Sequence, residues 1–401
     1  APRLRAYTEV ANNSITVPSF LDNRLHDTRR LLRWSSGLII LVYFTFYVSS
    51  GMVAGGRFFE SSFGMDYRLG MVIVAAITVV YTLIGGFLAV SYTDFIQGLM
   101  MVAALVMVPV VGVMHLGGVS NLVKAVSEVD PHYWAAWGPT TTLIGVISAL
   151  AWGLGYFGQP HIIVRFMALR SSADARHARR VGISWMVASM GGAVVTGLAG
   201  LAWFNQHPDR HLDDPETVFL ALSTILLHPL VAGFVLAAVL AAIMSTVSSQ
   251  LIVCSSALVH DLTRVFFSKE LSPRHQVWLG RLGVLLVSLV AAALAWTKND
   301  TILALVAFAW AGFGACFGPI VLLSLFWRRL TTAGTLAGLV VSATVVFTWQ
   351  YTPWRHVYEI IPGFAANSVV TMLVSGLTRA PEVDAEFTAM AELARSVPAR
   401  E

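Results

Sequence analysis

Charged residues divide this chain into long uncharged stretches. A helix needs about 20 apolar residues to cross the roughly 30 Å of hydrocarbon in a bilayer. Ten runs without Asp, Glu, Lys or Arg are candidates for such crossings: 34–56, 69–93, 95–123, 131–164, 181–208, 217–260, 282–297, 301–327, 330–354 and 360–378. The pattern therefore predicts ten membrane-spanning helices.

Two of these runs have unusual lengths. His228 and Pro229 divide the longest run into a short surface or re-entrant piece, 217–227, and a full span from 229 to 250. The run 282–297 is short, and a full crossing that starts at Val277 includes Arg281. The long side chain of an arginine in that position can reach the nearby interface.

Composition excludes several protein classes. The chain is 56% hydrophobic and 12% charged, whereas an ordinary soluble domain is about 25% charged. A soluble enzyme, a disordered chain and a coiled coil are therefore excluded. Lys and Arg stand in short clusters between apolar runs, which is typical of membrane loops and predicts no nucleic-acid partner. Cys254 and Cys316 lie in apolar sequence without metal-ligand spacing and are expected to act as small hydrophobic residues.

Ten crossings place both ends of the chain on one side of the membrane. Loops on that side hold 19 Lys and Arg residues, whereas loops on the other side hold six. Positive charge concentrates in the cytoplasmic loops of membrane proteins. The charge distribution therefore predicts that both ends are cytoplasmic.

The sequence LAWGLGYFGQPH, at 150–161, interrupts an otherwise good crossing. Gly153, Gly155, Gly158 and Pro160 disfavour helix by about 1 kcal/mol for each glycine and about 3 kcal/mol for proline. We therefore expect this helix to break at mid-membrane, where secondary transporters build substrate and ion sites. The alternative is a proline kink in which the glycines pack against a neighbouring helix.

Aromatic residues accompany the expected break. Trp152, Tyr156 and Pro160 have the spacing of four residues that aligns side chains on one face of a helix. Beside a break, such a face can form the wall of a binding site. Ordinary helix packing is the alternative for a stripe of this kind.

Hydroxyl side chains cluster at the end of the span from 229 to 250. They belong to Ser245, Thr246, Ser248 and Ser249. Hydroxyl and carbonyl oxygens are the ligands that a hard cation such as sodium prefers. Small polar residues also join helices by close packing, so the cluster indicates either a sodium site or a helix contact.

Asp94 stands between two predicted spans, in the short turn SYTDF. It is expected to be a solvated or capping carboxylate, and a gating role is the alternative. The sequence contains no phosphate-binding glycine loop, no HExxH and no CxxC, and His161 lies at a span end. These features give no support to an intramembrane enzyme.

Six stretches, which together extend along essentially the whole chain, carry a family pattern. They are SSGMVAGGRFFESSFGM (49–65), IGGFLAVSYTDFIQ (84–97), WGLGYFGQPHIIVRFMA (152–168), AAIMSTVSSQLIVCSSA (241–257), AWAGFGACFGPIVL (309–322) and YEIIPGF (358–364). In content and order they resemble the sodium/solute symporter family, and especially its bacterial sodium/proline branch.

The resemblance implies an all-α polytopic membrane protein with the leucine-transporter-type inverted-repeat fold. Ten of an expected thirteen transmembrane helices would be present, so the chain is expected to be truncated at its N-terminus and to lack a second broken helix. The implied division is a cytoplasmic loop (1–33), the last three helices of the first repeat (34–116), an extracytoplasmic loop (117–140), the five-helix second repeat (141–327), two C-terminal helices (328–378) and a cytoplasmic tail (379–401).

The resemblance also implies roles for particular residues. The substrate-binding positions that it implies are Tyr47, Trp152, Tyr156 and Pro160. The sodium positions that it implies are Ala242, through its carbonyl, Ser245 and Thr246. Asp94 matches an acid that the family uses in sodium-dependent function, here a possible gate.

The leading hypothesis is sodium-coupled import of L-proline by alternating access across a bacterial inner membrane. It implies no enzyme activity and no cofactor, with sodium as the coupling ion. The expected partners are L-proline, sodium and membrane lipid, and the oligomeric state stays open. The alternatives are a sodium symporter for another small solute, such as pantothenate, a sugar or a carboxylate, and a transporter-like membrane sensor domain.

Overall fold

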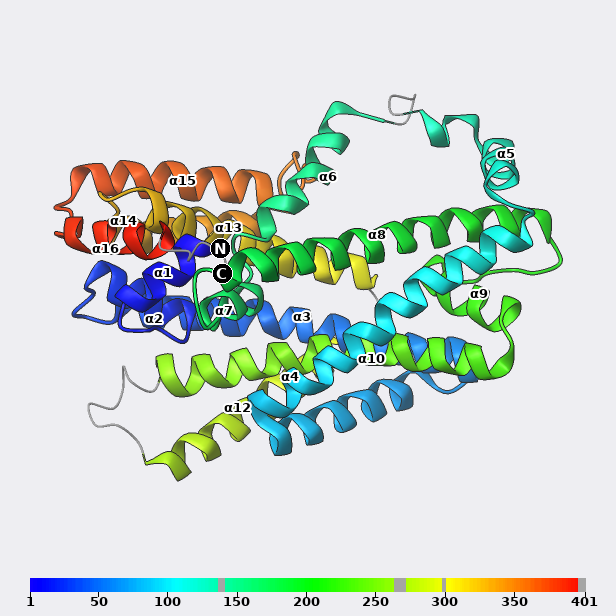
Figure 1. Cartoon of the computed structure of the whole chain (residues 1–401), viewed down its shortest axis with the longest axis horizontal. Coiled ribbons are helices and arrows are strands. Elements are labelled where there is room, and N and C mark those ends of the chain that lie inside the picture. The colour runs from blue at the N-terminus through cyan, green and yellow to red at the C-terminus, as the bar shows by residue number, and fades with distance from the viewer. Residues whose placement is uncertain (136–140, 263–271, 298–300, 396–401) are drawn as a thin grey trace, which may run out of the picture.

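The computed structural model describes residues 1–135, 141–262, 272–297 and 301–395. All regular secondary structure in these ranges is helical (Figure 1). In chain order the helices are α1 Pro2–Val10, α2 Val17–Leu25, α3 Leu31–Phe63, α4 Tyr67–His115, α5 Val119–Val129, η1 Pro131–Trp134, α6 Leu143–Gly155, α7 Pro160–Met167, α8 Asp174–Gln206, η2 Pro215–Thr217, α9 Val218–Leu226, α10 Pro229–Ser256, η3 Ala257–Leu262, α12 Pro273–Leu294, α13 Ile302–Phe326, α14 Thr332–Trp349, α15 Ile360–Leu377 and α16 Asp384–Arg395.

Nine helices among the described residues are long and apolar enough to cross a membrane. They lie in α3, α8, α10, α12, α13, α14 and α15, and α4 supplies two of them. The tenth predicted crossing, in the run 131–164, holds two shorter helices instead, α6 and α7. The predicted class of all-helical polytopic membrane protein is confirmed, and η2 with α9 forms the short piece expected near 217–227.

The structure moves the boundary that the sequence placed at Asp94. α4 contains one non-helical residue, Gly86, with φ 59° and ψ −163°. Only glycine adopts such angles readily, because it has no Cβ. The two apolar helices are therefore Tyr67–Gly86 and Leu88–His115, which meet at a sharp angle (Figure 1). The predicted turn at Asp94 is wrong, since Asp94 lies in the second turn of a helix.

Two clusters of buried hydrophobic side chains hold the bundle together. The larger cluster runs from α1 to α16 and contains the fully buried Tyr43, Phe44 and Phe313. The smaller cluster joins the second half of α4 to α5, α8, α9 and α10. α8 and α4 cross closely where Gly192 meets the carbonyl of Leu105. α6 lies along the outside of the bundle and contacts α13 and α15 (Figure 1).

The segments predicted as a loop (1–33) and a tail (379–401) contain packed helices. α1 and α2 lie in the first segment, and α16 in the second packs against α1. Arg24 of α2 is fully buried, with its guanidinium 5.2 Å from the ring centroid of Tyr7 and 5.0 Å from that of Phe387. It also donates to backbone carbonyls at the end of α13. Both segments are therefore part of the folded bundle, since their apolar side chains find partners there.

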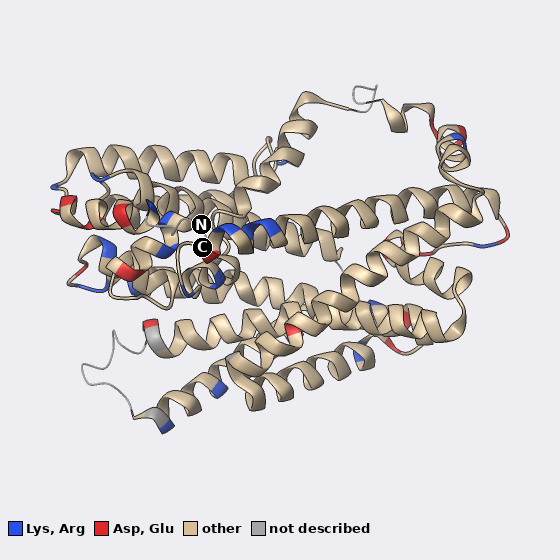
Figure 2. Cartoon of the chain, viewed as in Figure 1, with Lys and Arg blue, Asp and Glu red and all other residues tan. Residues whose placement is uncertain are grey.

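The charged side chains separate the two ends of the bundle (Figure 2). We name the end that holds α1, α2 and α16 the terminal end, and the end that holds α5 and α9 the loop end. Lys and Arg gather at the terminal end and in the first turns of α8, whereas the long helices carry few charges (Figure 2). α1 and α16 lie at the same end, as an even number of crossings requires. The side of the membrane that this end faces stays a prediction.

Candidate functional site

The helix that was predicted to break is divided in the structure. α6 ends at Gly155 and α7 begins at Pro160, so the crossing consists of two helices. Proline fits the first position of a helix, where no amide hydrogen is needed. A Cβ at Gly155 would overlap the indole of Trp310, and one at Gly158 would overlap the carbonyl oxygen of Phe313. The glycines therefore let α13 approach the break closely.

Two of the predicted substrate residues lie in one aromatic group. Trp152 stacks on Tyr358 with ring centroids 5.5 Å apart, and Tyr156 meets Trp310 edge to face at 4.9 Å. Trp310 Nε1 donates to the carbonyl of Trp152 at 2.9 Å. Tyr156 keeps 43% of its surface exposed. Trp310 and Tyr358 were not predicted as site residues, although both lie in stretches that carry the family pattern, 309–322 and 358–364.

The other two predicted substrate residues lie nearer the terminal end of the break. The ring of Tyr47, on α3, is 6.1 Å from the ring of His161, the second residue of α7. Pro160 is buried and lines a cavity of about 510 Å³, which extends to Thr16 in the segment between α1 and α2. The structure thus places all four residues around the break, but not on one continuous wall.

Gln159, immediately before α7, is a polar residue that the sequence analysis did not single out. Its side chain is fully buried, and its Nε2 donates to the carbonyl of Trp310 at 3.2 Å. Its Oε1 has no hydrogen-bond partner among the described residues. A buried acceptor without a donor is costly, so this oxygen marks a place where a ligand could donate a hydrogen bond.

The three predicted sodium residues lie together on α10. Ser245 Oγ and Thr246 Oγ1 both donate to the carbonyl oxygen of Ala242, at 3.1 and 2.9 Å. Three oxygens therefore gather within one turn of helix. Ser245 is buried, whereas Thr246 is exposed and can turn toward a neighbouring group. This set of hydroxyl and carbonyl oxygens fits sodium by its chemistry.

Asp94 joins three helices at the terminal end. Its Oδ2 accepts hydrogen bonds from Arg165 Nη2 of α7 at 2.7 Å and from Ser249 Oγ of α10 at 3.0 Å. Arg165 also donates to Ser249 at 2.9 Å, which closes the triangle. The carboxylate is 12% exposed and the arginine 52% exposed. Sequence reasoning identified Asp94 but missed Arg165 and gave Ser249 no part in this contact.

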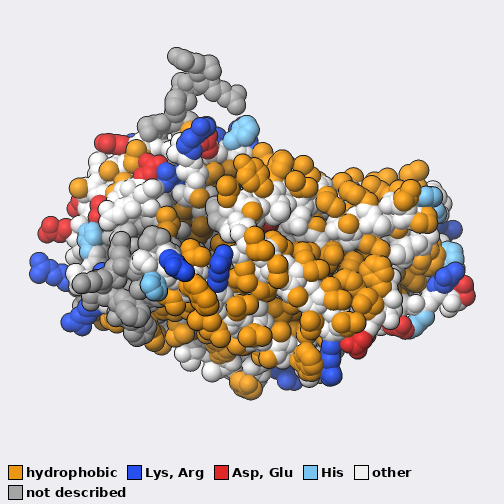
Figure 3. All heavy atoms as spheres, turned by 90° about the horizontal axis from the view of Figure 1, so that it is seen from below, with side chains coloured by type: hydrophobic (Ala, Val, Ile, Leu, Met, Phe, Trp, Pro, Cys, Tyr) orange, Lys and Arg blue, Asp and Glu red, His pale blue; other side chains and the backbone are white. Residues whose placement is uncertain are grey.

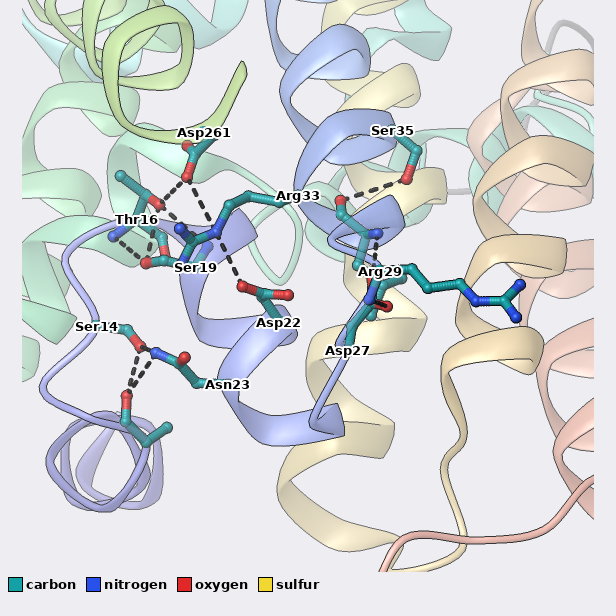
Figure 4. Close-up of polar contacts among 12 residues, drawn as sticks. Ser14, Thr16, Ser19, Asp22, Asn23, Asp27, Arg29, Arg33, Ser35 and Asp261 are labelled. Carbon is teal, nitrogen blue, oxygen red and sulfur yellow. Dashed lines mark hydrogen bonds and ion pairs between the residues drawn. The ribbon is translucent and has the colours of Figure 1, made fainter. Parts of the chain in front are cut away.

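A second polar cluster at the terminal end joins α2, α3 and η3 (Figure 4). Thr16 Oγ1 donates to Asp261 Oδ1 at 3.0 Å, and Arg33 Nε lies 3.0 Å from Asp22 Oδ2 and 4.0 Å from Asp261 Oδ1. All four side chains are buried. Burial raises the pKa of Asp22 above its usual range, and the charge of Arg33 opposes that rise. The cluster was missed, although Asp261 is the first charged residue after the run 217–260.

At the loop end, a third ion-pair cluster connects α3, the segment before α9, and α13. Arg57 Nη1 lies 2.5 Å from Asp214 Oδ2 and 2.6 Å from Glu216 Oε2. Glu216 also accepts hydrogen bonds from the first amides of α13, those of Ile302 and Leu303, at 3.3 and 3.2 Å. Only 9% of the Arg57 side chain is exposed. One buried arginine therefore fixes two carboxylates over the start of α13.

Several known proteins are similar to this chain. The high-affinity proline transporter PutP of Bacillus subtilis (strain 168) is 56% identical over 382 residues, which cover 95% of this chain and 80% of that protein. The osmoregulated proline transporter OpuE of the same strain is 50% identical, with 95% and 78% covered. A sodium/proline symporter of Staphylococcus aureus (strain JH9) is 50% identical, with 95% and 76% covered.

A solved structure shares the fold. A Na⁺-coupled sialic acid symporter in its substrate-bound outward-open state superposes with a TM-score of 0.76 at 17% identity, covering 95% of this chain and 87% of that one. The leucine-transporter-type fold expected from the sequence is thereby confirmed. The family model described as Sodium:solute symporter family matches residues 1–342, and on that match the chain belongs to the sodium:solute symporter family.

Proposed function

We propose that this protein imports L-proline together with sodium, by alternating access. The observation that carries the proposal is the identity of 50–56% with relatives named as proline transporters. The geometry supports it, because a broken helix, an aromatic group and a set of oxygen ligands lie in one bundle. No enzyme activity is part of the proposal, and sodium is the coupling ion.

The substrate would bind at the break between α6 and α7. Trp152 and Tyr156 provide apolar faces for the pyrrolidine ring, and Tyr47 and Pro160 bound the site toward the terminal end. Gln159 Oε1 has no donor among the described residues, so it suits the substrate's secondary ammonium group. A site of this kind favours a small ring with one charged nitrogen over a sugar, whose hydroxyls would lose their partners.

Sodium would bind to the carbonyl of Ala242 and the hydroxyls of Ser245 and Thr246. Both hydroxyls already point at that carbonyl, so binding requires them to turn their lone pairs toward the ion. The ion drives transport only if it binds one conformation of the protein more tightly than the other. A potential of about 100 mV and a tenfold gradient together supply about 3.7 kcal/mol per sodium, which permits several hundredfold accumulation.

Asp94 would act as part of a gate at the terminal end. Its bonds to Arg165 and Ser249 join α4, α7 and α10, and α10 also holds the proposed sodium ligands. Opening that end requires these bonds to break. When these bonds break, water can replace Asp94 as the partner of Arg165, because half of the arginine side chain is exposed.

Transport in proteoliposomes tests the substrate assignment. We expect sodium-driven uptake of L-proline that excess glucose and pantothenate do not reduce. Trp152→Ala and Tyr156→Ala should each raise the half-saturating proline concentration about tenfold. Trp278→Ala is the matched control, because Trp278 is an exposed aromatic residue on α12. Uptake of pantothenate or a sugar in place of proline would contradict the assignment.

Apparent sodium affinity tests the ion assignment separately. Ser245→Ala and Thr246→Ala should each weaken it about tenfold. Thr344→Ala is the control, because Thr344 Oγ1 likewise donates to a backbone carbonyl of its own helix, that of Val340 in α14, at 2.8 Å. Equal effects at all three positions would mean that these hydroxyls serve helix packing.

The proposed location is the bacterial inner membrane, with the terminal end in the cytoplasm. Cysteine introduced at Asp213 should react with an impermeant thiol reagent added outside intact cells, whereas cysteine at Ser172 should not. Asp213 lies at the loop end with 97% of its side chain exposed. The native Cys254 and Cys316 are buried and provide a low background. Labelling at Ser172 alone would reverse the orientation.

A further inference from the structure

Arg281 is a basic residue inside an otherwise apolar helix. It is the ninth residue of α12, about 12 Å from the start of that helix, and no charged residue follows it in α12. Its side chain is exposed, as are those of Val277 and Leu285, one turn to either side. Viewed from below, the molecule shows a largely hydrophobic face with a few Lys or Arg side chains among the apolar ones (Figure 3). Arg281 therefore lies at the depth where hydrocarbon gives way to lipid head groups.

Arg281 lines a cavity of about 490 Å³ between α4, α10 and α12. Gln276 and Arg281 line it from α12, and Ser255 and Ser256 line it from α10. The apolar side of the cavity includes the exposed Ile84 and Val277, together with residues of all three helices. The cavity thus combines a cation and hydroxyl donors with an apolar border that faces the surroundings of the bundle.

Arg281 has no opposite charge beside it in the part of the chain that the structure describes. No ion pair of Arg281 occurs within residues 1–135, 141–262, 272–297 and 301–395. A charged side chain at membrane depth is costly unless an opposite charge accompanies it, and such residues mark functional sites. Basic cavities between transmembrane helices on the cytoplasmic side are suited to anionic lipid head groups.

We propose that this cavity binds one anionic phospholipid from the leaflet at the terminal end. The guanidinium of Arg281 pairs with the lipid phosphate, since its planar fork matches two phosphate oxygens. Ser255 and Ser256 donate to the remaining head-group oxygens. The acyl chains lie along Ile84 and Leu285. A phosphodiester alone would satisfy the arginine, but only a lipid would also cover these apolar side chains.

The bound lipid would touch the bend of α4. Gly85 and Gly86 line the same cavity, and Gly86 carries the non-helical angles that separate the two halves of α4. Asp94 lies two turns beyond that bend. A lipid bound in the cavity would therefore stabilise the bend at Gly86. The helix that follows this bend carries Asp94.

Native mass spectrometry on protein released from bilayer discs tests this site. In discs of equimolar phosphatidylglycerol and phosphatidylcholine, the wild-type protein should retain one phosphatidylglycerol. Arg281→Gln should lower that occupancy about fivefold, whereas Arg281→Lys should keep most of it. The matched control is Arg274→Gln, on the same helix but outside the cavity lining. Equal losses in Arg281→Gln and Arg274→Gln would indicate diffuse charge attraction and overturn the proposal.

Two further measurements keep the test decisive. Ser255→Phe fills the cavity while leaving Arg281 in place, and position 255 does not line the cavity near Pro160. This variant should therefore lose the lipid as well, even if Arg281→Gln folds poorly. Retention of phosphatidylglycerol by Ser255→Phe would overturn the proposed position. Millimolar inorganic phosphate should not displace the lipid. Displacement by phosphate would show a site for the free anion and would also overturn the assignment to a lipid.

Discussion

The Arg57 cluster at the loop end and the Asp94 cluster at the terminal end each join helices from distant parts of the chain, and their arginines differ in burial. At the loop end, the side chain of Arg57 is 9% exposed and pairs with Asp214 and Glu216. In the Asp94 cluster, the side chain of Arg165 is 52% exposed, and that of its partner Asp94 is 12% exposed. The loop-end cluster therefore cannot lose a partner without leaving a buried charge. In the Asp94 cluster, the exposed Arg165 can exchange its partner for water.

The difference separates stability from movement. A buried arginine between two carboxylates resists opening, because each unpaired charge in a low-dielectric site is costly. An ion pair whose arginine is half-exposed contributes less to stability, because water can replace the carboxylate as the partner of the arginine. We infer that the Arg57 cluster holds its helices in a fixed arrangement, whereas the Asp94 cluster is suited to repeated opening.

The largest expected effect is that of Arg57→Ala. It leaves Asp214 and Glu216 without their shared cation and should lower the free energy of unfolding by about 3 kcal/mol. Thermal unfolding of the detergent-solubilised protein measures this loss. Arg68→Ala is the control, since Arg68 at the same end makes a cation–π contact with Trp296 at 5.1 Å. An equal loss of stability in both variants would contradict the proposal that Arg57 stabilises the bundle by pairing with two carboxylates.

A smaller effect is expected at Glu216, which also caps α13. Glu216→Ala removes an acceptor from the amides of Ile302 and Leu303 and should cost about 2 kcal/mol. Glu216→Gln keeps an acceptor oxygen and should restore part of that loss. Hydrogen exchange at the first amides of α13 should rise in Glu216→Ala and less in Glu216→Gln. Unchanged exchange in both would show that water caps this helix equally well.

At the terminal end, Asp94→Asn should change the free energy of unfolding by less than about 1 kcal/mol. Sodium-driven uptake should nevertheless fall about tenfold, because the contact acts during opening and closing. Unfolding and uptake measured on the same preparation separate the two effects. A loss of stability as large as that of Arg57→Ala would contradict the distinction between the Arg57 cluster and the Asp94 cluster.

The smallest effect is expected from Ser249→Ala. This change removes one hydroxyl from the triangle and should cost about 0.5 kcal/mol. A double-mutant cycle with Asp94→Asn should give a coupling energy of about 0.5 to 1 kcal/mol. The pair Thr344→Ala and Asp94→Asn is the control, since Thr344 lies on α14, away from the triangle. Additive losses for Ser249 and Asp94 would mean that their hydrogen bond contributes nothing.

The helical class and nine of the ten predicted crossings follow from the sequence, because bilayer thickness sets the length of a spanning helix. The break before Pro160 was also predictable, since glycine and proline act locally. The bend in α4 was not predicted, because the charge of Asp94 was used as a boundary while the backbone turned at Gly86. A charged residue marks the end of a membrane span only when no other residue neutralises its charge. Arg165 pairs with Asp94, so Asp94 can lie within a helix.

The contacts of the site join residues that are far apart in the chain, and a local sequence pattern cannot show which distant residues meet. Arg165 is 71 residues from Asp94, and Arg57 is 157 residues from Asp214. Ser245 and Thr246 were predictable as a pair, because one turn of α10 holds both. Trp310 and Gln159 were missed, since their contact joins two helices across the break.

The contact between α1 and α16 has a consequence for the order in which the protein is made. Tyr7 Oη donates to Glu386 Oε2 at 3.0 Å, and these residues are 379 positions apart. At about 5 to 20 residues per second, the ribosome supplies the second partner roughly 20 to 80 seconds after the first. During that interval α16 is not yet available to pack against the apolar side of α1. Nascent chains should therefore bind a chaperone or the translocon near α1 until synthesis passes α16, and chains stalled before Asp384 should be cut by protease within α1 or α2.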